Sequence, residues 1–384
     1  MFTYPLDMRF ISLYLGRRSI CILCIAAGCI GCMCKIIPSF DILLLGRIFD
    51  GIFTGLLTSP FQQWYIDEHQ VSFDFPSEWT HSTFLILSFG SGFLSVFAGI
   101  TSQIIVSISE VLIIPYLMST VTLIVGGFFI SLQWKENRSV DAPLPFRNVI
   151  AKALGVIRSN PTTLLLSVTT CFAEMASQMY AFVWAPLFIQ AQQNEVGSDY
   201  ALGIIYASFA ASYLTGLLIF FSFATKYRSS RLLLLSLISA FLVFVVATRE
   251  LPFIHEDWTN IRFECVYLCM VVFEIACGVY TPAIETLQST ILHFLPQRSA
   301  VLALIRLPLT FLLSLSIMVF FPTPGGEMKM MIFIVIQLFI SALLSLLLDA
   351  VVINRGYEQD PDRFFLPRTS AGEVRQSENT MISF

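Results

Sequence analysis

Ten long apolar stretches make up most of this 384-residue chain. A helix that crosses a bilayer needs about 20 mainly apolar residues, and each stretch meets that length. The ten predicted spans lie near residues 19–37, 41–65, 81–107, 111–133, 162–190, 200–223, 231–249, 262–286, 299–321 and 329–353. Only 12% of the residues are charged, and 36 are Phe. The sequence therefore predicts an all-α polytopic membrane protein, with the lipid bilayer as its main surrounding.

A basic, proline-containing segment separates the first four spans from the last six. We expect four parts: an N-terminal transmembrane bundle at 1–133, a cytoplasmic linker at 134–160, a six-helix C-terminal bundle at 161–354 and a disordered polar tail at 355–384. Within the linker, apolar residues from Phe146 to Ile157 recur at helical spacing beside Lys152 and Arg158. This pattern predicts an amphipathic helix, which lies on the membrane surface, straps the two bundles together, or does both.

Basic residues gather at one set of helix ends, and the positive-inside rule assigns those ends to the cytoplasm. They include Arg17, Arg18, Lys135, Arg147, Lys152, Arg158, Lys226, Arg228, Arg231 and Arg298. The opposite ends carry little beyond Lys35, Arg249 and Lys329. With ten spans, both termini are then cytoplasmic. We expect an integral, multi-pass protein of the plasma membrane.

Composition and spacing argue against several other classes of protein. The net charge of -4 and the absence of a basic run exclude nucleic acid as an expected partner. Cys21, Cys24, Gly28 and Cys32 share one face of an apolar helix, which favours close helix packing over a metal site. The four histidines are scattered and form no H-E-x-x-H motif. We therefore expect no enzyme, metal or cofactor, and the oligomeric state is left open.

Charged residues inside the predicted spans are the first candidates for function. An Arg or Asp at the centre of a membrane helix costs about 2.5–3.5 kcal/mol, so such residues face the interior of a bundle or a wet cavity. Arg47 and Asp50 are three residues apart and can pair with each other; the alternative is that Arg47 lines a solute path. Arg306 has no acid close to it in its own helix and needs a carboxylate elsewhere or an anion.

Polar and aromatic motifs follow one another in a definite order. They are GRIFDG at Gly46–Gly51, FQQWYIDEH at Phe61–His69, FPSEW at Phe75–Trp79, Glu174 ten residues before Trp184, EIACG at Glu274–Gly278 followed by Tyr280, and Arg306 with Pro308. In this order, from about Leu15 to Arg355, the chain resembles the molybdate-anion transporter family of the major facilitator superfamily. The family places a Glu at the position of Gln62 and a small residue at that of Asp50.

The resemblance implies a major facilitator fold with two six-helix bundles around a central cavity. By that count this chain holds spans three to twelve, so we expect an incomplete fold of about ten transmembrane helices, four plus six, which lacks the first two spans. The resemblance implies a secondary transporter that takes up molybdate or a related small inorganic anion by alternating access. The alternatives are a non-transporting membrane sensor or binding protein, and a carrier of another small solute such as a sugar.

The candidate residues divide by expected role. Guanidinium groups suit a tetrahedral oxyanion because they offer forked donors and stay charged. We expect substrate contacts from Arg47, Arg306, Trp184 and Tyr280. Glu174 and Glu274 are the mid-span carboxyls available for proton coupling. Gating or structural roles are expected for Asp50, Gln62, Trp64, Glu68 and His69.

Overall fold

The computed structural model describes residues 16–57, 59–75, 77–136, 146–194, 201–249, 260–292, 298–320, 322–323 and 325–355. These residues are helical apart from short connections, and they contain no strand, so the all-α prediction is confirmed. At some helical positions, Arg306 among them, only the backbone is described.

The helices of the first half are α2 (Arg17–Cys34), α3 (Phe40–Leu56), α4 (Ser59–Asp67), the π-helical turn η1 (Glu68–Ser72), α5 (Ser77–Ser109) and α6 (Ile114–Gln133). Those that follow are α7 (Phe146–Ser159), α8 (Pro161–Asn194), α9 (Leu202–Phe223), α10 (Ser229–Arg249), α11 (Asn260–Ile291), α12 (Arg298–Phe320) and α13 (Gly326–Arg355).

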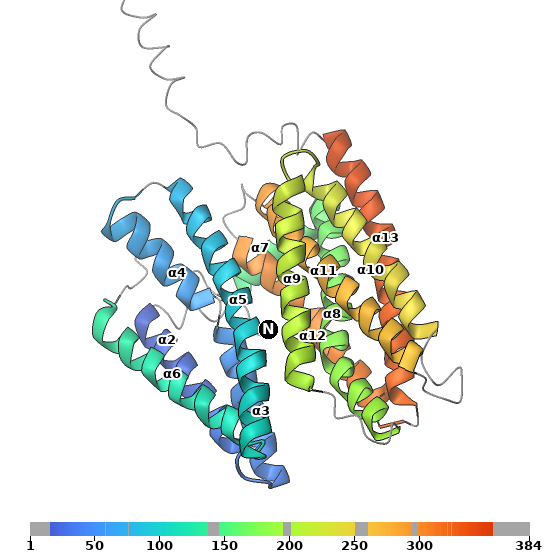
Figure 1. The fold of residues 1–384 in the computed structure, drawn as a ribbon. Helices are drawn as coiled ribbons and strands as arrows, with labels where there is room; N and C mark the ends of the chain where they lie inside the picture. The colour runs from blue at the N-terminus through green and yellow to red at the C-terminus, as the bar shows by residue number, and fades with distance from the viewer. Residues whose placement is uncertain are drawn as a thin grey trace, which may run out of the picture.

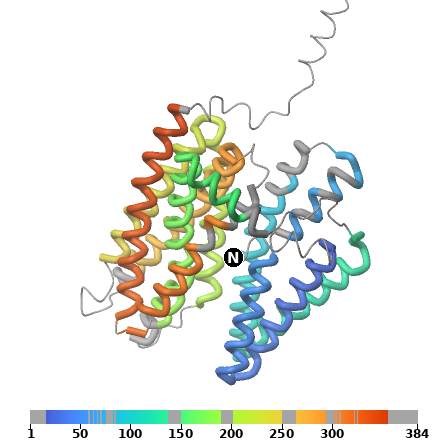
Figure 2. The backbone as a smooth tube through the Cα atoms, turned by 180° about the vertical axis from the view of Figure 1, so that it is seen from behind, coloured from blue at the N-terminus to red at the C-terminus, as the bar shows by residue number. Residues whose placement is uncertain are grey.

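The helices form two groups that lie side by side (Figure 1). In the first group α2 packs against α3, α4 and α6; in the second, α8 packs against α12 and α13, and α11 against α9 and α10. The view from behind shows the same division, with the blue to blue-green helices on one side and the green to red helices on the other (Figure 2). The seam between the groups is formed by α5 and α9.

Small residues allow α5 and α9 to touch backbone to backbone. A Cβ added at Gly99 would lie 2.8 Å from the Gly203 carbonyl oxygen, and one added at Gly203 would lie 2.7 Å from that of Gly99. The backbone N–H of Gly203, in the first turn of α9, donates to Gln103 Oε1 at 2.9 Å. Farther along, the rings of Phe89 and Phe221 lie 5.6 Å apart. The seam therefore follows much of both helices.

The expected packing of α2 through small residues is present. Cys21, Cys24 and Gly28 are buried, whereas Cys32 is half-buried. An added Cβ at Gly28 would lie 2.7 Å from the Phe53 ring of α3. These small side chains let α3 lie close to α2, as they do between membrane helices generally.

The stretch 41–65, expected as one span, contains two helices instead, because α3 ends at Leu56 and α4 begins at Ser59. Pro60 is the second residue of α4. Proline lacks an N–H and clashes with the preceding turn, so it suits the first turn of a helix and disfavours a continuous helix through this point.

α7 is the amphipathic helix predicted within the linker. Ala153 is fully buried, and Val156 and Ile157 pack with it against the second group of helices. Lys152 and Arg158 are exposed. Part of the apolar face thus packs on the second group of helices, whereas Leu154 is 52% exposed.

The outer surface of the helices is strongly apolar. Large side chains such as Phe40, Ile108, Phe311 and Met318 are at least 70% exposed. Within the described residues, seven helices are long and apolar enough to cross a membrane. The protein is therefore an integral, multi-pass membrane protein, while the full count of ten spans stays a prediction.

Candidate functional site

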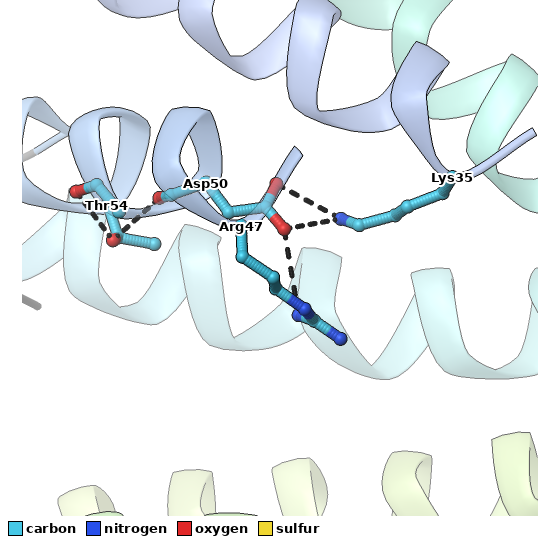
Figure 3. A network of polar contacts seen from close by, with 5 residues as sticks. Lys35, Arg47, Asp50 and Thr54 are labelled. Atoms are coloured by element: carbon cyan, nitrogen blue, oxygen red, sulfur yellow. Dashed lines mark hydrogen bonds and ion pairs between the residues drawn. The ribbon is translucent and has the colours of Figure 1, made fainter. Parts of the chain in front are cut away.

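Asp50 lies at the centre of a small charged cluster between α2 and α3 (Figure 3). Lys35, the residue that caps the C-terminus of α2, places Nζ 2.9 Å from Asp50 Oδ2 and 3.1 Å from Oδ1. Arg47 Nη1 lies 3.6 Å from Asp50 Oδ2. Lys35 Nζ also lies 5.3 Å from the centre of the Tyr116 ring of α6, a distance that permits a cation–π interaction. Two cations thus share one carboxylate.

The two cations of this cluster differ in the exposed fraction of their side chains. The side chains of Lys35 and Asp50 are each 22% exposed, whereas that of Arg47 is 77% exposed. In Figure 3 the Arg47 guanidinium extends away from the α2 ribbon, below the Asp50 carboxylate and the Lys35 ammonium. Asp50 is therefore matched mainly by Lys35, and Arg47 keeps most of its donors available. The predicted pair of Arg47 and Asp50 is present, but it is the longer of the two ion pairs.

Arg306, the second predicted arginine, lies on α12 in the other group of helices. Its side chain falls outside the described part of the structure, so a common site for Arg47 and Arg306 stays a prediction. The backbone does show that α12 packs against α8, the helix that carries Glu174.

The two candidate carboxyls for proton coupling occupy the second group of helices. Glu174 on α8 and Glu274 on α11 are both half-buried. Glu274 lies beside the Tyr180 hydroxyl of α8, within electrostatic range. One turn after Glu274, the Cys277 Sγ lies 4.0 Å from Ser177 Oγ of α8. Polar side chains therefore line this contact between α8 and α11.

Trp184 and Tyr280 pack in the two apolar cores of the second group. The Trp184 ring meets the Phe209 ring edge-on, with centroids 5.6 Å apart, and the Phe188 ring at 6.3 Å. Tyr280 is 9% exposed and belongs to the second core cluster. Both aromatic side chains contribute to helix packing here, and their predicted contact with substrate stays a prediction.

The α4 residues predicted to gate or to support the fold lie in different surroundings. The Trp64 ring stacks on Trp134 at 3.7 Å, and Trp64 Nε1 donates to the Lys135 carbonyl at 2.9 Å. Gln62 is exposed. Trp64 therefore fastens α4 to the segment that follows α6, and its predicted gating or structural role stays a prediction.

Glu68 and His69 belong to the π-helical turn η1, a feature often associated with functional sites. His69 is buried, and its Nδ1 lies 3.3 Å from the Tyr65 hydroxyl. That hydroxyl donates to Thr83 Oγ1 at 2.8 Å, and Ser72 Oγ donates to Glu68 Oε2 at 3.0 Å. The Tyr65 hydroxyl thus links His69 of η1 and Thr83 of α5, while the Ser72–Glu68 bond lies within η1.

Two residues near the candidate site had no place among the predictions. Lys35 was assigned to a helix end, and only the pairing of α2 with α3 brings it to Asp50. Tyr180 is one of 12 tyrosines and belongs to no motif, so the sequence offers no signal for it.

Comparison with known proteins decides the family. The sequence profile of a major facilitator family, described as sugar transporters with 12 transmembrane segments, matches residues 9–264, which is more than half of the chain. The chain belongs to this family. Major facilitator proteins are transporters and not enzymes, in agreement with the sequence analysis.

The chain is also similar to individual proteins of the superfamily. The chain is 27% identical over 339 residues to the molybdate-anion transporter of Takifugu rubripes, which covers 80% of this chain and 67% of that protein. It is 28% identical to the proteins of the same name in Danio rerio (79% and 66%) and Xenopus laevis (79% and 65%). The resemblance found in the sequence is confirmed. The major facilitator chain spans about two thirds of the length of these relatives.

Solved structures support the fold. A bacterial homologue of the lysosomal transporter Spinster, inward-facing and unoccupied, matches with a TM-score of 0.57 at 16% identity, over 91% of this chain and 86% of that one. The E. coli fucose:proton symporter FucP also matches with a TM-score of 0.57, at 11% identity, over 90% and 87%. At these identities the likeness shows the major facilitator fold alone.

Proposed function

We propose that this chain is a secondary transporter that carries molybdate or a related oxyanion across the plasma membrane. The observation that carries the proposal is the similarity to three molybdate-anion transporters along about four fifths of the chain. Both termini would lie in the cytoplasm, as the distribution of Arg and Lys predicts. The bundle within 1–133 and the six-helix bundle at 161–354 would move relative to each other in alternating access.

The charged cluster on α3 supplies chemistry that suits an oxyanion. The Arg47 guanidinium is exposed and is only partly compensated, because Asp50 lies closer to Lys35. A guanidinium offers paired N–H donors that match two oxygens of a tetrahedral anion. Arg47 from one bundle and Arg306 from the other would then bind the anion between the bundles, with Trp184 and Tyr280 as aromatic neighbours.

The membrane potential opposes uptake of an anion, so accumulation needs cation symport or another gradient. Moving a dianion into a negative interior costs about 4.6 kcal/mol per 100 mV. Two protons carried with it would make the step electrically neutral, and Glu174 and Glu274 are the mid-span carboxyls that could hold them. Proton symport is therefore the coupling we propose.

Uptake by the purified full chain in proteoliposomes tests the proposal. Radiolabelled molybdate should accumulate, faster with an inward proton gradient, and unlabelled tungstate should compete. We expect Arg47→Gln to lower uptake at low substrate about 10- to 100-fold, the equivalent of one lost charge-assisted contact. Lys329→Gln, at an exposed helix end, is the matched control and should leave uptake unchanged. Equal uptake by Arg47→Gln and the unmodified chain would exclude this arginine from the site.

A sugar carrier is the second candidate, because the matching family is described as sugar transporters. The same proteoliposomes decide between the two: accumulation of labelled monosaccharides, unaffected by molybdate, would replace the oxyanion proposal. Binding of molybdate without any flux would instead favour a sensor or binding protein.

A further inference from the structure

The Tyr180 hydroxyl is a buried polar group in the second group of helices. Tyr180 is 4% exposed, and its ring meets Phe273 edge-on at 4.7 Å and Phe244 at 5.8 Å. The hydroxyl oxygen is fully buried and has no hydrogen-bond partner in the described structure. A buried polar group without a partner is costly, and such groups in native proteins call for an explanation. A phenylalanine would fill the same space without that cost.

The Glu274 carboxyl is the acid that lies against this hydroxyl. Tyr180 is on α8 and Glu274 on α11, two helices that pack together, and the two side chains interact electrostatically. No hydrogen bond of normal geometry joins them in this structure. The two side chains are thus adjacent, without a hydrogen bond of normal geometry between them.

None of the other described titratable groups around Glu274 is a cation. Tyr213 faces it from α9, and Cys277 lies beside it on α11. The α10 side chain described against Tyr180 and Phe273 is Phe244. Among the described side chains that face Glu274 there is no Lys, Arg or His. A charged Glu274 therefore depends on hydrogen-bond donors, and Tyr180 offers a buried O–H beside it.

Resting on the proposed proton coupling through Glu274, we propose that Tyr180 is a positioning residue for that carboxyl. When the Glu274 carboxylic acid releases its proton to water, the Tyr180 O–H donates a hydrogen bond to the carboxylate; when the carboxyl is protonated again, that bond opens. Tyr180 keeps its own proton throughout.

Substitution of the hydroxyl alone tests this role. Tyr180→Phe should keep the fold, because it removes only an unpartnered atom. We expect it to shift the pH profile of molybdate uptake and to change uptake about fivefold near the midpoint, the equivalent of one hydrogen bond. Tyr267→Phe is the matched control: this tyrosine belongs to the same aromatic cluster, but its hydroxyl donates to Ser208 Oγ at 2.7 Å. It should leave the profile unchanged.

The Glu274→Gln background separates the two claims. There the pH dependence should be lost, and Tyr180→Phe should have no further effect. If uptake by the unmodified chain depends on pH and Tyr180→Phe has the same pH profile, the role of Tyr180 is overturned and proton coupling stays intact. A flat profile in the unmodified chain would overturn the coupling, and this role with it.

A measurement without transport checks the pairing itself. Thermal unfolding midpoints in detergent should be non-additive for Tyr180→Phe, Glu274→Gln and the double variant, because coupled side chains give a non-zero interaction in such a cycle. Additive midpoints across the pH range would overturn the pairing even if uptake were absent.

Discussion

At the scale of single residues, Asp50 compensates two cations and is the least replaceable member of its cluster. Asp50→Asn should lower the free energy of unfolding by about 1–3 kcal/mol, between the values typical of exposed and of buried ion pairs. The reason is that Lys35, 22% exposed, would lose its charged partner: the Asn amide keeps one oxygen that can accept from Nζ, but an NH₂ group replaces the second acceptor. The thermal unfolding midpoint in detergent measures this change.

The other members of the cluster provide the controls for Asp50. Arg47→Gln should have little effect on stability, since its side chain is 77% exposed and 3.6 Å from the carboxylate. Lys35→Met alone should also lower the stability. The double variant Lys35→Met/Asp50→Asn should lose less stability than the sum of the two single losses. Strict additivity of the two would contradict a Lys35–Asp50 pair.

The same cluster shows which contacts a sequence can predict. The three-residue spacing of Arg47 and Asp50 predicts their contact, because helix geometry alone fixes it. The Lys35 contact depends on how α2 and α3 lie against each other, which small residues such as Gly28 determine. Periodicity predicts that such a packing face exists, but not which residue of the next helix meets it.

At the scale of helices, α9 and α11 cross at their backbones. A Cβ added at Gly278 would overlap the Tyr213 carbonyl and lie 2.8 Å from Gly216 Cα. Backbone atoms cannot rotate away, so Gly278→Ala must separate the helices. We expect a loss of about 1–3 kcal/mol of stability, as for other overpacked interiors, measured by thermal unfolding.

In Gly126→Ala, on α6, the new Cβ meets nothing within 4 Å, and this control should be neutral or up to about 1 kcal/mol more stable. Equal effects at both sites would contradict the close crossing.

The helices themselves were largely predictable, because long apolar runs have few other solutions in a membrane protein. The predicted amphipathic helix of the linker corresponds to α7. The break between α3 and α4 was missed, although Pro60 marks it. A helix break within a continuous apolar stretch is not visible in composition, because composition alone does not specify backbone geometry. Periodicity predicts the apolar face of α7, but no local pattern specifies that Ala153 on this face packs against the second group of helices.

At the scale of the whole molecule, the two groups of helices meet along α5 and α9, and Gln103 is the polar link in the described seam near the start of α9. Gln103 Oε1 accepts from the Gly203 N–H, one of the backbone donors that a helix start leaves unsatisfied. The residue that precedes α9, Ala201, supplies no side-chain cap of its own. A side chain of one group thus caps a helix of the other.

Gln103→Ala should therefore loosen the two groups at the end where α5 stops and α9 begins. One hydrogen bond is worth about 1 kcal/mol, which is a several-fold change in a two-state equilibrium between a closed and a parted end. Spin labels at the exposed positions Leu112 and Met318, in a background without other reactive cysteines, would report the separation of the groups. We expect a longer, broader distance distribution for Gln103→Ala and an unchanged one for Gln133→Ala, at the exposed end of α6. Identical distributions for Gln103→Ala and its parent would show that glycine packing alone, at Gly99 and Gly203, holds the seam.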